Sequence, residues 1–351
     1  MSENSQENGH ISRRGLIVGG GAAAALGGAA MLLAACSPEK PAAAAAASVG
    51  TGSAQAGKKV VFIVHDKNSF FAPVQAGFED FGKAMGWKTQ FNGPSPQDVQ
   101  QTVDMQKNAL NSKPDGVIFT CIDPTAFDAN IQQAIDSKIP VVLSNVATGA
   151  DKKFRIGFVG QSFIVAGIDA GMLAAKYAKQ HTGQTSGVII VGNFAPGNSA
   201  LDDRATGIKQ GVDRFNQQNG TSYTTELLVT STDETKAVGA IDARYRKSPV
   251  VGWAMTAFDH QFVATWAKQN NLVGKFAVGG FDETAPVLQG IKDGGIDFTL
   301  GQNPYAQGWL AAAMIAEQIG AGYPGSSVDT GAEIVDKSNI AEIMVREAKY
   351  A

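Results

Sequence analysis

The chain has 351 residues, of which 44% are hydrophobic and 17% are charged, and its formal net charge is −3. This length and apolar content suit a globular protein of about two domains. The 32 acidic residues outnumber the 29 basic ones, which argues against a nucleic-acid-binding protein because that class carries a basic surplus. The two cysteines, Cys36 and Cys121, and the four histidines form neither a C-x-x-C nor an H-x-x-x-H pair, so we expect no structural zinc site.

The N-terminal segment is expected to lie outside the folded domains. A twin-arginine pattern at 13–14 precedes an apolar run at 17–35, which ends in the lipobox-like sequence Leu33-Ala34-Ala35-Cys36. We predict that 1–36 is a twin-arginine or lipoprotein signal whose Cys36 is lipidated, so that the protein is anchored to the membrane in the periplasm or at the cell surface. A transmembrane anchor, or a plain signal peptide with an incidental cysteine, is the alternative. The Pro-, Ala-, Gly- and Ser-rich stretch 37–57 is predicted to be a flexible tether.

After the tether, short apolar strands alternate with amphipathic helices. The run at 59–64 is β-branched and ungapped, which is typical of a strand buried on both faces of a parallel sheet. A helix follows it, with Pro73 in the first turn and apolar residues at helical spacing as far as Met85. Further strands are predicted at 87–91, 116–120, 140–143 and 155–159, and helices at 97–110 and 125–137.

The same alternation then starts again from residue 161. Helices are predicted at 161–180, 198–218, 235–247, 259–270, 283–293 and 305–319, and strands at 187–191, 225–229, 250–255, 276–279 and 296–300. Such alternation specifies a right-handed parallel sheet covered by helices. The predicted fold class is therefore α/β, with two doubly wound, Rossmann-like parallel-sheet domains and a ligand cleft between the facing carboxyl ends of their strands.

Loops at the carboxyl ends of strands are where open α/β sheets hold ligands. Here these loops combine aromatic rings, amides, carboxylates and one guanidinium. The candidate ligand-binding residues are Asn68, Phe70, Phe71, Asp123, Asn145, Arg204, Phe258, Asp259, Asp282 and Gln302. A sugar or polyol suits this set, because its C–H faces pack on rings and its hydroxyls pair with planar polar groups. The sequence has no phosphate-cradling Gly-Lys-Ser/Thr loop, and we expect neither a cofactor nor a metal.

Six short motifs follow one another in these loops and strands. They are Asn68-Ser69-Phe70-Phe71, Asp123-Pro124-Thr125, Ile139-Pro140-Val141-Val142, Gly197-Asn198-Ser199 with Arg204, Gly279-Gly280-Phe281-Asp282, and Gly301-Gln302-Asn303. In this order and at this spacing they resemble the ribose- and galactose-binding branch of the type I periplasmic binding proteins, the substrate-binding subunits of sugar ABC importers. The resemblance runs from Lys58 to the C-terminal end of the sequence.

The resemblance implies a domain organisation in which the chain crosses three times between domains. The crossings would fall near Gly160, Gln302 and Val335. The first domain would then consist of 58–160 plus 303–333, and the second of 161–302 plus 334–351. Together the three crossings would form a hinge.

The resemblance also implies roles for the matching residues. Phe70 and Phe71, which follow Asn68, would sandwich a sugar. Arg204 would donate hydrogen bonds to ring or hydroxyl oxygens, and Asp282 would accept hydrogen bonds from two hydroxyls. The protein would be a non-catalytic binding protein that closes on its ligand by hinge rotation, docks on a membrane permease and releases the ligand there. We expect a monomer, because one cleft suffices for transport.

Two departures from the family pattern make the expected site more apolar than a ribose site. Ribose binders carry an Asp-Arg pair where this chain has Asn145-Val146, so strong charge-assisted contacts are missing. Phe258-Asp259 stands where the family often has Asn-Asp, which adds a ring and removes an amide. We therefore expect a deoxy sugar, a pentitol or tetritol, or a furanose-like sugar as the ligand, in preference to ribose.

Several of the candidate residues also have a structural alternative. Phe70 and Phe71 could both belong to the core at the start of the helix. Asp282 and Asp123 could cap the helices that follow them, because Asp is a favoured N-cap residue. Arg204 could be a surface residue that pairs with one of the aspartates just before it in the sequence.

Three other functional classes compete with the importer subunit. A transcriptional repressor with the same core needs a basic helix-turn-helix before the first strand, where this chain has an export signal. An exported hydrolase is disfavoured, because the stretch at 160–164 departs from Gly-x-Ser-x-Gly at its last position. A sensory subunit that presents its ligand to a membrane receptor would share the same cleft, and only the neighbouring membrane protein would distinguish it from a transporter subunit.

Overall fold

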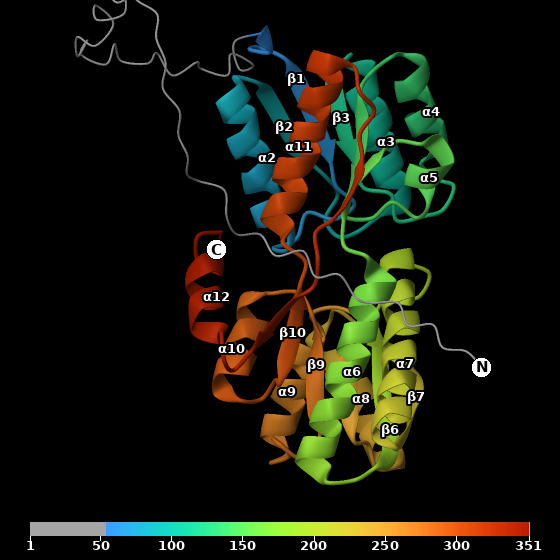
Figure 1. Cartoon of the computed structure of the whole chain (residues 1–351), viewed down its shortest axis with the longest axis vertical. Helices are drawn as coiled ribbons and strands as arrows, with labels where there is room; N and C mark the ends of the chain where they lie inside the picture. Colours follow the sequence, from blue (N-terminus) through green and yellow to red (C-terminus); the bar gives the residue numbers. More distant parts are fainter. Residues whose placement is uncertain (1–53, 351) are drawn as a thin grey trace, which may run out of the picture. The chain divides into compact units, whose positions relative to one another are not determined.

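The computed structural model describes residues 54–350, so the predicted signal, Cys36 and most of the predicted tether lie outside the described residues. The tether prediction is wrong for its last residues, because Gln55 is buried and donates to the Ala316 backbone oxygen at 2.9 Å. The described part contains two six-stranded sheets, each covered by helices (Figure 1). We call each sheet with its helices a lobe. The predicted fold class, two parallel-sheet α/β units, is confirmed.

The first lobe is built on an all-parallel sheet in the order β11-β5-β4-β3-β1-β2. Its strands are β1 (Lys59–Ile63), β2 (Lys88–Asn92), β3 (Gly116–Phe119), β4 (Val141–Ser144), β5 (Gly157–Gly160) and β11 (Ser327–Asp329). Its helices are α2 (Phe71–Met85), α3 (Val99–Asn111), α4 (Asp128–Asp136), α5 (Ala150–Phe154) and α11 (Pro304–Ala321).

The second lobe has the strand order β12-β10-β9-β8-β6-β7, in which β12 is antiparallel to β10 and the other pairs are parallel. Its strands are β6 (Ser186–Asn193), β7 (Ser222–Val229), β8 (Gly252–Met255), β9 (Ala277–Phe281), β10 (Phe298–Gly301) and β12 (Glu333–Asp336). Its helices are α6 (Phe163–Thr182), α7 (Ser199–Asn219), α8 (Glu234–Lys247), α9 (His260–Gln269), α10 (Ala285–Asp293) and α12 (Ile340–Glu347).

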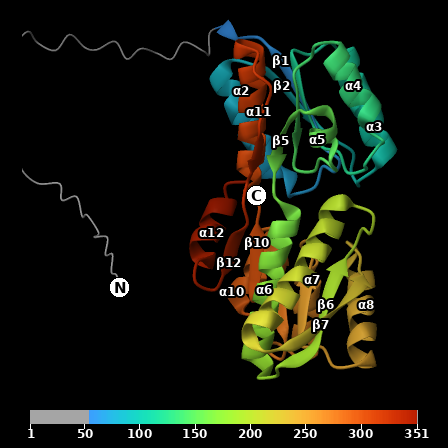
Figure 2. The same ribbon diagram turned by 45° about the vertical axis from the view of Figure 1, so that its right-hand side comes forward.

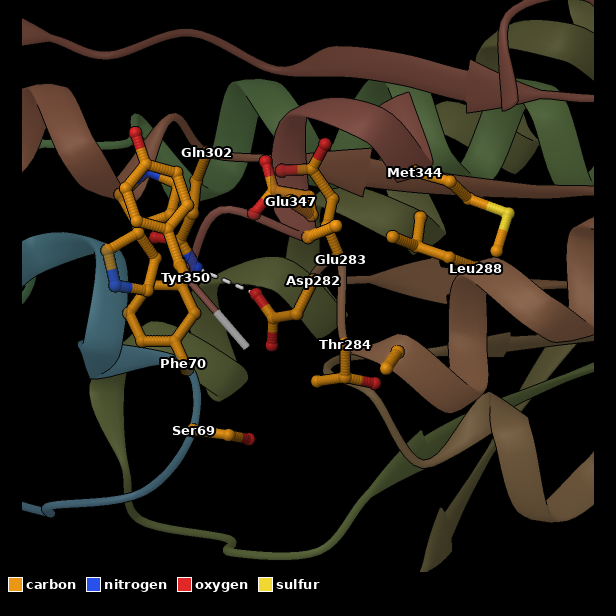
Figure 3. A pocket seen from close by; sticks show the side chains of 14 residues that line it. Ser69, Phe70, Asp282, Glu283, Thr284, Leu288, Gln302, Met344, Glu347 and Tyr350 are labelled. Atoms are coloured by element: carbon orange, nitrogen blue, oxygen red, sulfur yellow. Dashed lines mark hydrogen bonds between the residues drawn. The ribbon is translucent and has the colours of Figure 1, made fainter. Parts of the chain in front are cut away.

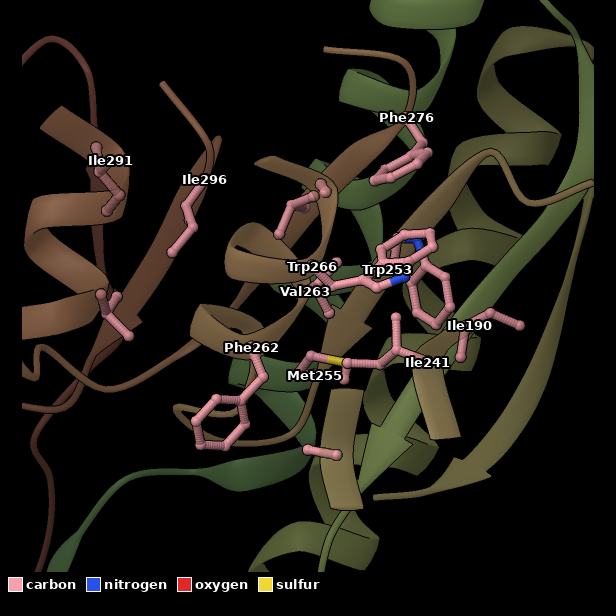
Figure 4. Close-up of a cluster of buried hydrophobic side chains, with 14 of the residues drawn as sticks. Ile190, Ile241, Trp253, Met255, Phe262, Val263, Trp266, Phe276, Ile291 and Ile296 are labelled. Carbon is pink, nitrogen blue, oxygen red and sulfur yellow. The ribbon is translucent and has the colours of Figure 1, made fainter. Parts of the chain in front are cut away.

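The central strands of each sheet are buried on both faces, which explains the ungapped apolar runs in the sequence. In β1, Val61 and Ile63 pack towards α3 and α4, while Val60 and Phe62 pack towards α2 and α11. In the second lobe, Trp253 of β8 belongs to a cluster with residues of α8, α9, α10 and α12 (Figure 4). The opposite face of that sheet packs against α6 and α7.

Glycines allow α6 and α7 to pack at very short range, and the two helices lie side by side (Figure 2). A Cβ atom on Gly171 of α6 would lie 2.1 Å from the backbone oxygen of Ile208, and one on Gly167 would lie 2.5 Å from that of Arg204. Because any larger residue would push the helices apart, these glycines determine how far α7 stands from α6. The position of Arg204 therefore depends on this helix pair.

The chain passes between the two sheets three times. It leaves β5 at Gly160 for α6, returns from β10 at Gly301 to α11, and leaves β11 at Asp329 for β12. Each passage is only a few residues long, so three short segments connect the lobes. Within residues 54–350, no helix is both long enough and apolar enough to cross a membrane.

Candidate ligand-binding cleft

A cavity of about 470 Å³ lies between loops of both lobes. Its walls combine residues that follow β1, β4, β6, β8 and β9, as expected for the carboxyl ends of parallel strands. Eight of the ten predicted residues line it, namely Asn68, Phe70, Phe71, Asn145, Arg204, Phe258, Asp282 and Gln302. The volume suits a small ligand of the size of a monosaccharide.

The first-lobe wall is made by the loop after β1. The Asn68 side chain shapes this loop, because its Oδ1 accepts a hydrogen bond from the Phe70 backbone N–H at 3.0 Å and its Nδ2 donates to Asp66 at 3.0 Å. The Phe70 and Phe71 rings meet edge to face at 5.0 Å. Phe71 is only 2% exposed and also belongs to the core, whereas Phe70 is half-buried. The cleft and core interpretations of Phe71 are therefore compatible.

Arg204 forms the centre of the second-lobe wall and is only 3% exposed. Its Nε and Nη2 donate to Gln161 Oε1 at 3.2 and 2.9 Å, and its Nη1 donates to the Thr256 backbone oxygen at 3.0 Å. The Phe281 ring centroid lies 4.1 Å from the guanidinium carbon. These contacts hold the guanidinium in a single orientation. They also rule out the alternative that Arg204 is a surface residue.

Asp282 follows β9 and adopts a left-handed backbone conformation, with φ of 75°. Its Oδ1 accepts a hydrogen bond from Gln302 Nε2 at 2.7 Å and lies 3.9 Å from Arg204 Nη2. Burial raises the pKa of Asp282, and the nearby Arg204 and Gln302 oppose that shift. The N-cap of α10 is Thr284, not Asp282, so the helix-cap alternative does not account for this carboxylate.

Three amides form a network where the cleft meets the inter-lobe passages. Asn145 Nδ2 donates to the Oε1 atoms of Gln302 and Gln307, at 3.3 and 3.0 Å. Gln307 Nε2 lies 3.1 Å from Gln302 Oε1 and 3.3 Å from Thr330 Oγ1. Gln302 belongs to the second passage and Thr330 to the third, so the network links the cleft floor to two of the three connections.

Two predicted residues do not reach the cavity. Asp123 accepts hydrogen bonds from the backbone N–H groups of Thr125 and Ala126, at 2.9 and 2.8 Å, and so stabilises the turn that precedes α4. Asp259 is fully buried behind Phe258, where Thr230 Oγ1 donates to its Oδ2 at 2.6 Å. Burial raises the pKa of Asp259 to about 6.

The structure also adds aromatic residues that the sequence interpretation missed. Phe194 lies opposite the first-lobe rings and packs on Phe258, with ring centroids 5.6 Å apart. Phe163, in the first turn of α6, lies 5.2 Å from the Arg204 guanidinium. Phe194 directly follows β6. The rule that ligands lie at strand ends would have selected it if the sequence analysis had ended that strand at the right residue.

His65 also lines the cleft. Its Nδ1 is hydrogen-bonded to Thr120 Oγ1 at 3.0 Å, and burial lowers its pKa to about 4.

The fold and the cleft together define a class, namely two-lobed α/β proteins that enclose a small ligand between sheets joined by three short connections. The sequence model of the periplasmic binding protein domain matches residues 60–322. The chain therefore belongs to the periplasmic binding protein family, as the sequence motifs predicted.

Similar proteins are known by sequence and by structure. The xylose/arabinose-binding protein XylF of Sulfolobus acidocaldarius is 27% identical over 301 residues, which cover 80% of this chain and 72% of that protein. The fructose import binding protein FruE of Bifidobacterium longum is 25% identical over 265 residues, covering 72% and 77%. A solute-binding protein from Burkholderia graminis, solved with D-arabinose, superposes with a TM-score of 0.72 at 22% identity, covering 82% of this chain and 97% of that one.

Proposed function

We propose that this protein is the extracytoplasmic solute-binding subunit of an ABC importer for a small sugar or polyol. The observation that carries the proposal is a cleft with aromatic rings on both walls around Arg204, Asp282 and Gln302. Membership of the periplasmic binding protein family supports it, and so do relatives named for binding xylose, arabinose and fructose.

The physical basis is complementarity between the cleft and a sugar ring. Phe70 on one lobe and Phe194 on the other pack on the apolar C–H faces of the ligand. The Asp282 carboxylate accepts hydrogen bonds from hydroxyls, and the side-chain oxygen of Asn145 accepts from a further hydroxyl. Such contacts give affinities in the micromolar range or tighter, about −8 kcal/mol or better.

The preferred ligand is a pentose other than ribose, a deoxy sugar or a sugar alcohol. Asn145 is neutral, so it offers no charged clamp for the anomeric side of a sugar. Its amide nitrogen is also already hydrogen-bonded to Gln302 and Gln307. Phe258 and Phe194 form an apolar corner, which favours a methyl or methylene group over a hydroxyl because a buried hydroxyl without a partner is costly.

The three passages between the lobes act as a hinge in this proposal. The first domain comprises 58–160 plus 303–333, and the second comprises 161–302 plus 334–351. Closure buries the ligand, and the closed monomer docks on its permease. A lipid on Cys36, followed by a tether that ends before residue 54, keeps the protein at the membrane surface. The protein itself catalyses no reaction and needs no cofactor.

A thermal-shift screen of the purified protein tests this function. The ligands are pentoses, hexoses, deoxy sugars, polyols, amino acids and nucleosides. A ligand that binds only the folded state, at one hundred times its Kd, stabilises that state by about 2.7 kcal/mol and raises Tm. We expect a rise with one or a few carbohydrates that Asp282→Ala abolishes. A rise with an amino acid or a nucleoside, and with no carbohydrate, would refute the proposal.

A further inference from the structure

A second cavity, of about 260 Å³, adjoins the cleft on the side of the C-terminal helix α12. Phe70, Asp282 and Gln302 line both cavities. Figure 3 shows Phe70, Tyr350 and Gln302 on one side of this second cavity and Leu288 and Met344 on the other. Asp282 lies between the two sides and accepts the hydrogen bond from Gln302. The second cavity therefore begins where the ligand-binding cleft ends.

The chemistry of this cavity differs from that of the cleft. Rings and aliphatic side chains make most of its surface. The carboxylates of Glu283 and Glu347 also line it, but both are ion-paired with Arg346 of α12. A second sugar ring would bury several hydroxyls here against carbon, which is unfavourable without hydrogen-bond partners. An apolar group would instead gain from leaving water.

The size of the cavity limits what it can hold. A cavity of about 150 Å³ lined by apolar side chains is sufficient for benzene, so 260 Å³ has room for a phenyl ring or a short alkyl chain. A group that enters it from the cleft must pass the shared residues Phe70, Asp282 and Gln302. The same molecule would then contact the proposed sugar-binding groups and this cavity at once.

We propose that the second cavity is a subsite for an apolar substituent on the bound sugar. The ligand range of this protein therefore includes alkyl or aryl glycosides of its parent sugar. This inference rests on the proposed function, because the sugar ring must occupy the cleft for the substituent to reach the subsite.

Calorimetric titration of the purified protein with a glycoside series tests the subsite. The probes are the sugar found in the screen and its methyl, n-butyl and phenyl glycosides, each as both anomers. For one anomer we expect about fourfold tighter binding per added methylene between methyl and butyl, which corresponds to about 0.8 kcal/mol for each buried methylene. Equal or weaker binding of the butyl glycosides of both anomers, relative to methyl, would overturn the inference.

Variants that fill the cavity provide the second arm of the test. Ala348 and Ala285 line the cavity and are exposed, so Ala348→Trp and Ala285→Trp add a ring without disturbing the core. Ala341→Trp, at an exposed position of α12 outside the cavity, is the matched control. We expect the two filling variants to weaken the butyl and phenyl glycosides at least tenfold while the free sugar changes less than twofold, and the control to change neither.

The outcomes separate this inference from the proposed function. Equal losses for free sugar and glycosides in both filling variants would refute the subsite. If no sugar binds the wild-type protein, the proposed function itself fails. Melting curves of each variant establish that the titrated protein is folded.

Discussion

Asp282→Asn is the substitution that most directly tests the electrostatics of the cleft. It keeps the size of the side chain, and the Asn carbonyl oxygen can still accept the hydrogen bond that Gln302 donates at 2.7 Å. What it removes is the negative charge, which lies 3.9 Å from the buried Arg204 guanidinium. The change therefore isolates the charge from the shape of the site.

The expected loss follows from the contacts of the carboxylate. A hydrogen bond to a charged group contributes about 1.5–3 kcal/mol. If Asp282 accepts hydrogen bonds from two ligand hydroxyls, as proposed, losing the charge weakens binding by about 3 kcal/mol, or roughly a hundredfold in Kd. The protein should also lose stability, because the 3%-exposed Arg204 then has a neutral neighbour in place of a charged one.

Isothermal titration with the parent sugar, well below the melting temperature, measures this loss. Asp123→Asn is the matched control, because Asp123 stabilises a turn outside the cavity and its loss should leave Kd unchanged. A change of less than threefold for Asp282→Asn would refute the reasoning. So would equal effects of the two substitutions, because the carboxylate at 282 would then be no more important than one outside the cleft.

Two predictions concern stability. Gly171→Ala should lower the free energy of unfolding in urea by about 1–3 kcal/mol, because the new methyl would lie 2.1 Å from the Ile208 backbone oxygen. The control is Gly239→Ala, at an exposed position of α8 with open space around it, and it should raise the free energy of unfolding by about 0.5–1 kcal/mol. Similar effects of the two substitutions would contradict the packing argument. The second prediction concerns Asp259. Between pH 3.8 and about 6, Asp259 stays protonated in the folded chain but loses its proton in the unfolded chain. The free energy of unfolding of the wild type therefore falls as pH rises through this window, and Asp259 contributes at most about 3 kcal/mol to that fall. The free energy of unfolding of Asp259→Asn, relative to wild type, should rise by that amount over the same window, and a difference independent of pH would show that the carboxyl is not buried as described.

The sequence by itself determined the fold class and most of the cleft. Strands such as β1 are apolar on both faces because helices cover both sides of a parallel sheet. The alternation of strands and helices could therefore be predicted from the sequence alone. The rule that ligands lie at the carboxyl ends of such strands then selected the loops with Phe70 and Asp282 and the first turns of the helix that carries Arg204. All three line the cavity.

Only the tertiary structure decided which side chains in those loops face the ligand. Phe258 and Asp259 are adjacent, yet the first lines the cleft and the second is fully buried behind it. The direction of each side chain depends on backbone angles, such as the positive φ of Asn145 and Asp282, which contacts with distant segments maintain. No local pattern encodes those contacts.

The second cavity depends even more on long-range packing. Its walls come from the loop after β1, the start of α10, the passage at Gln302 and the end of α12, which are far apart in the sequence. Tyr350 reaches the first lobe, where its ring lies 5.8 Å from that of Tyr305. Each wall segment alone is an ordinary loop or helix end, and the cavity exists only because the folded chain brings the four segments together.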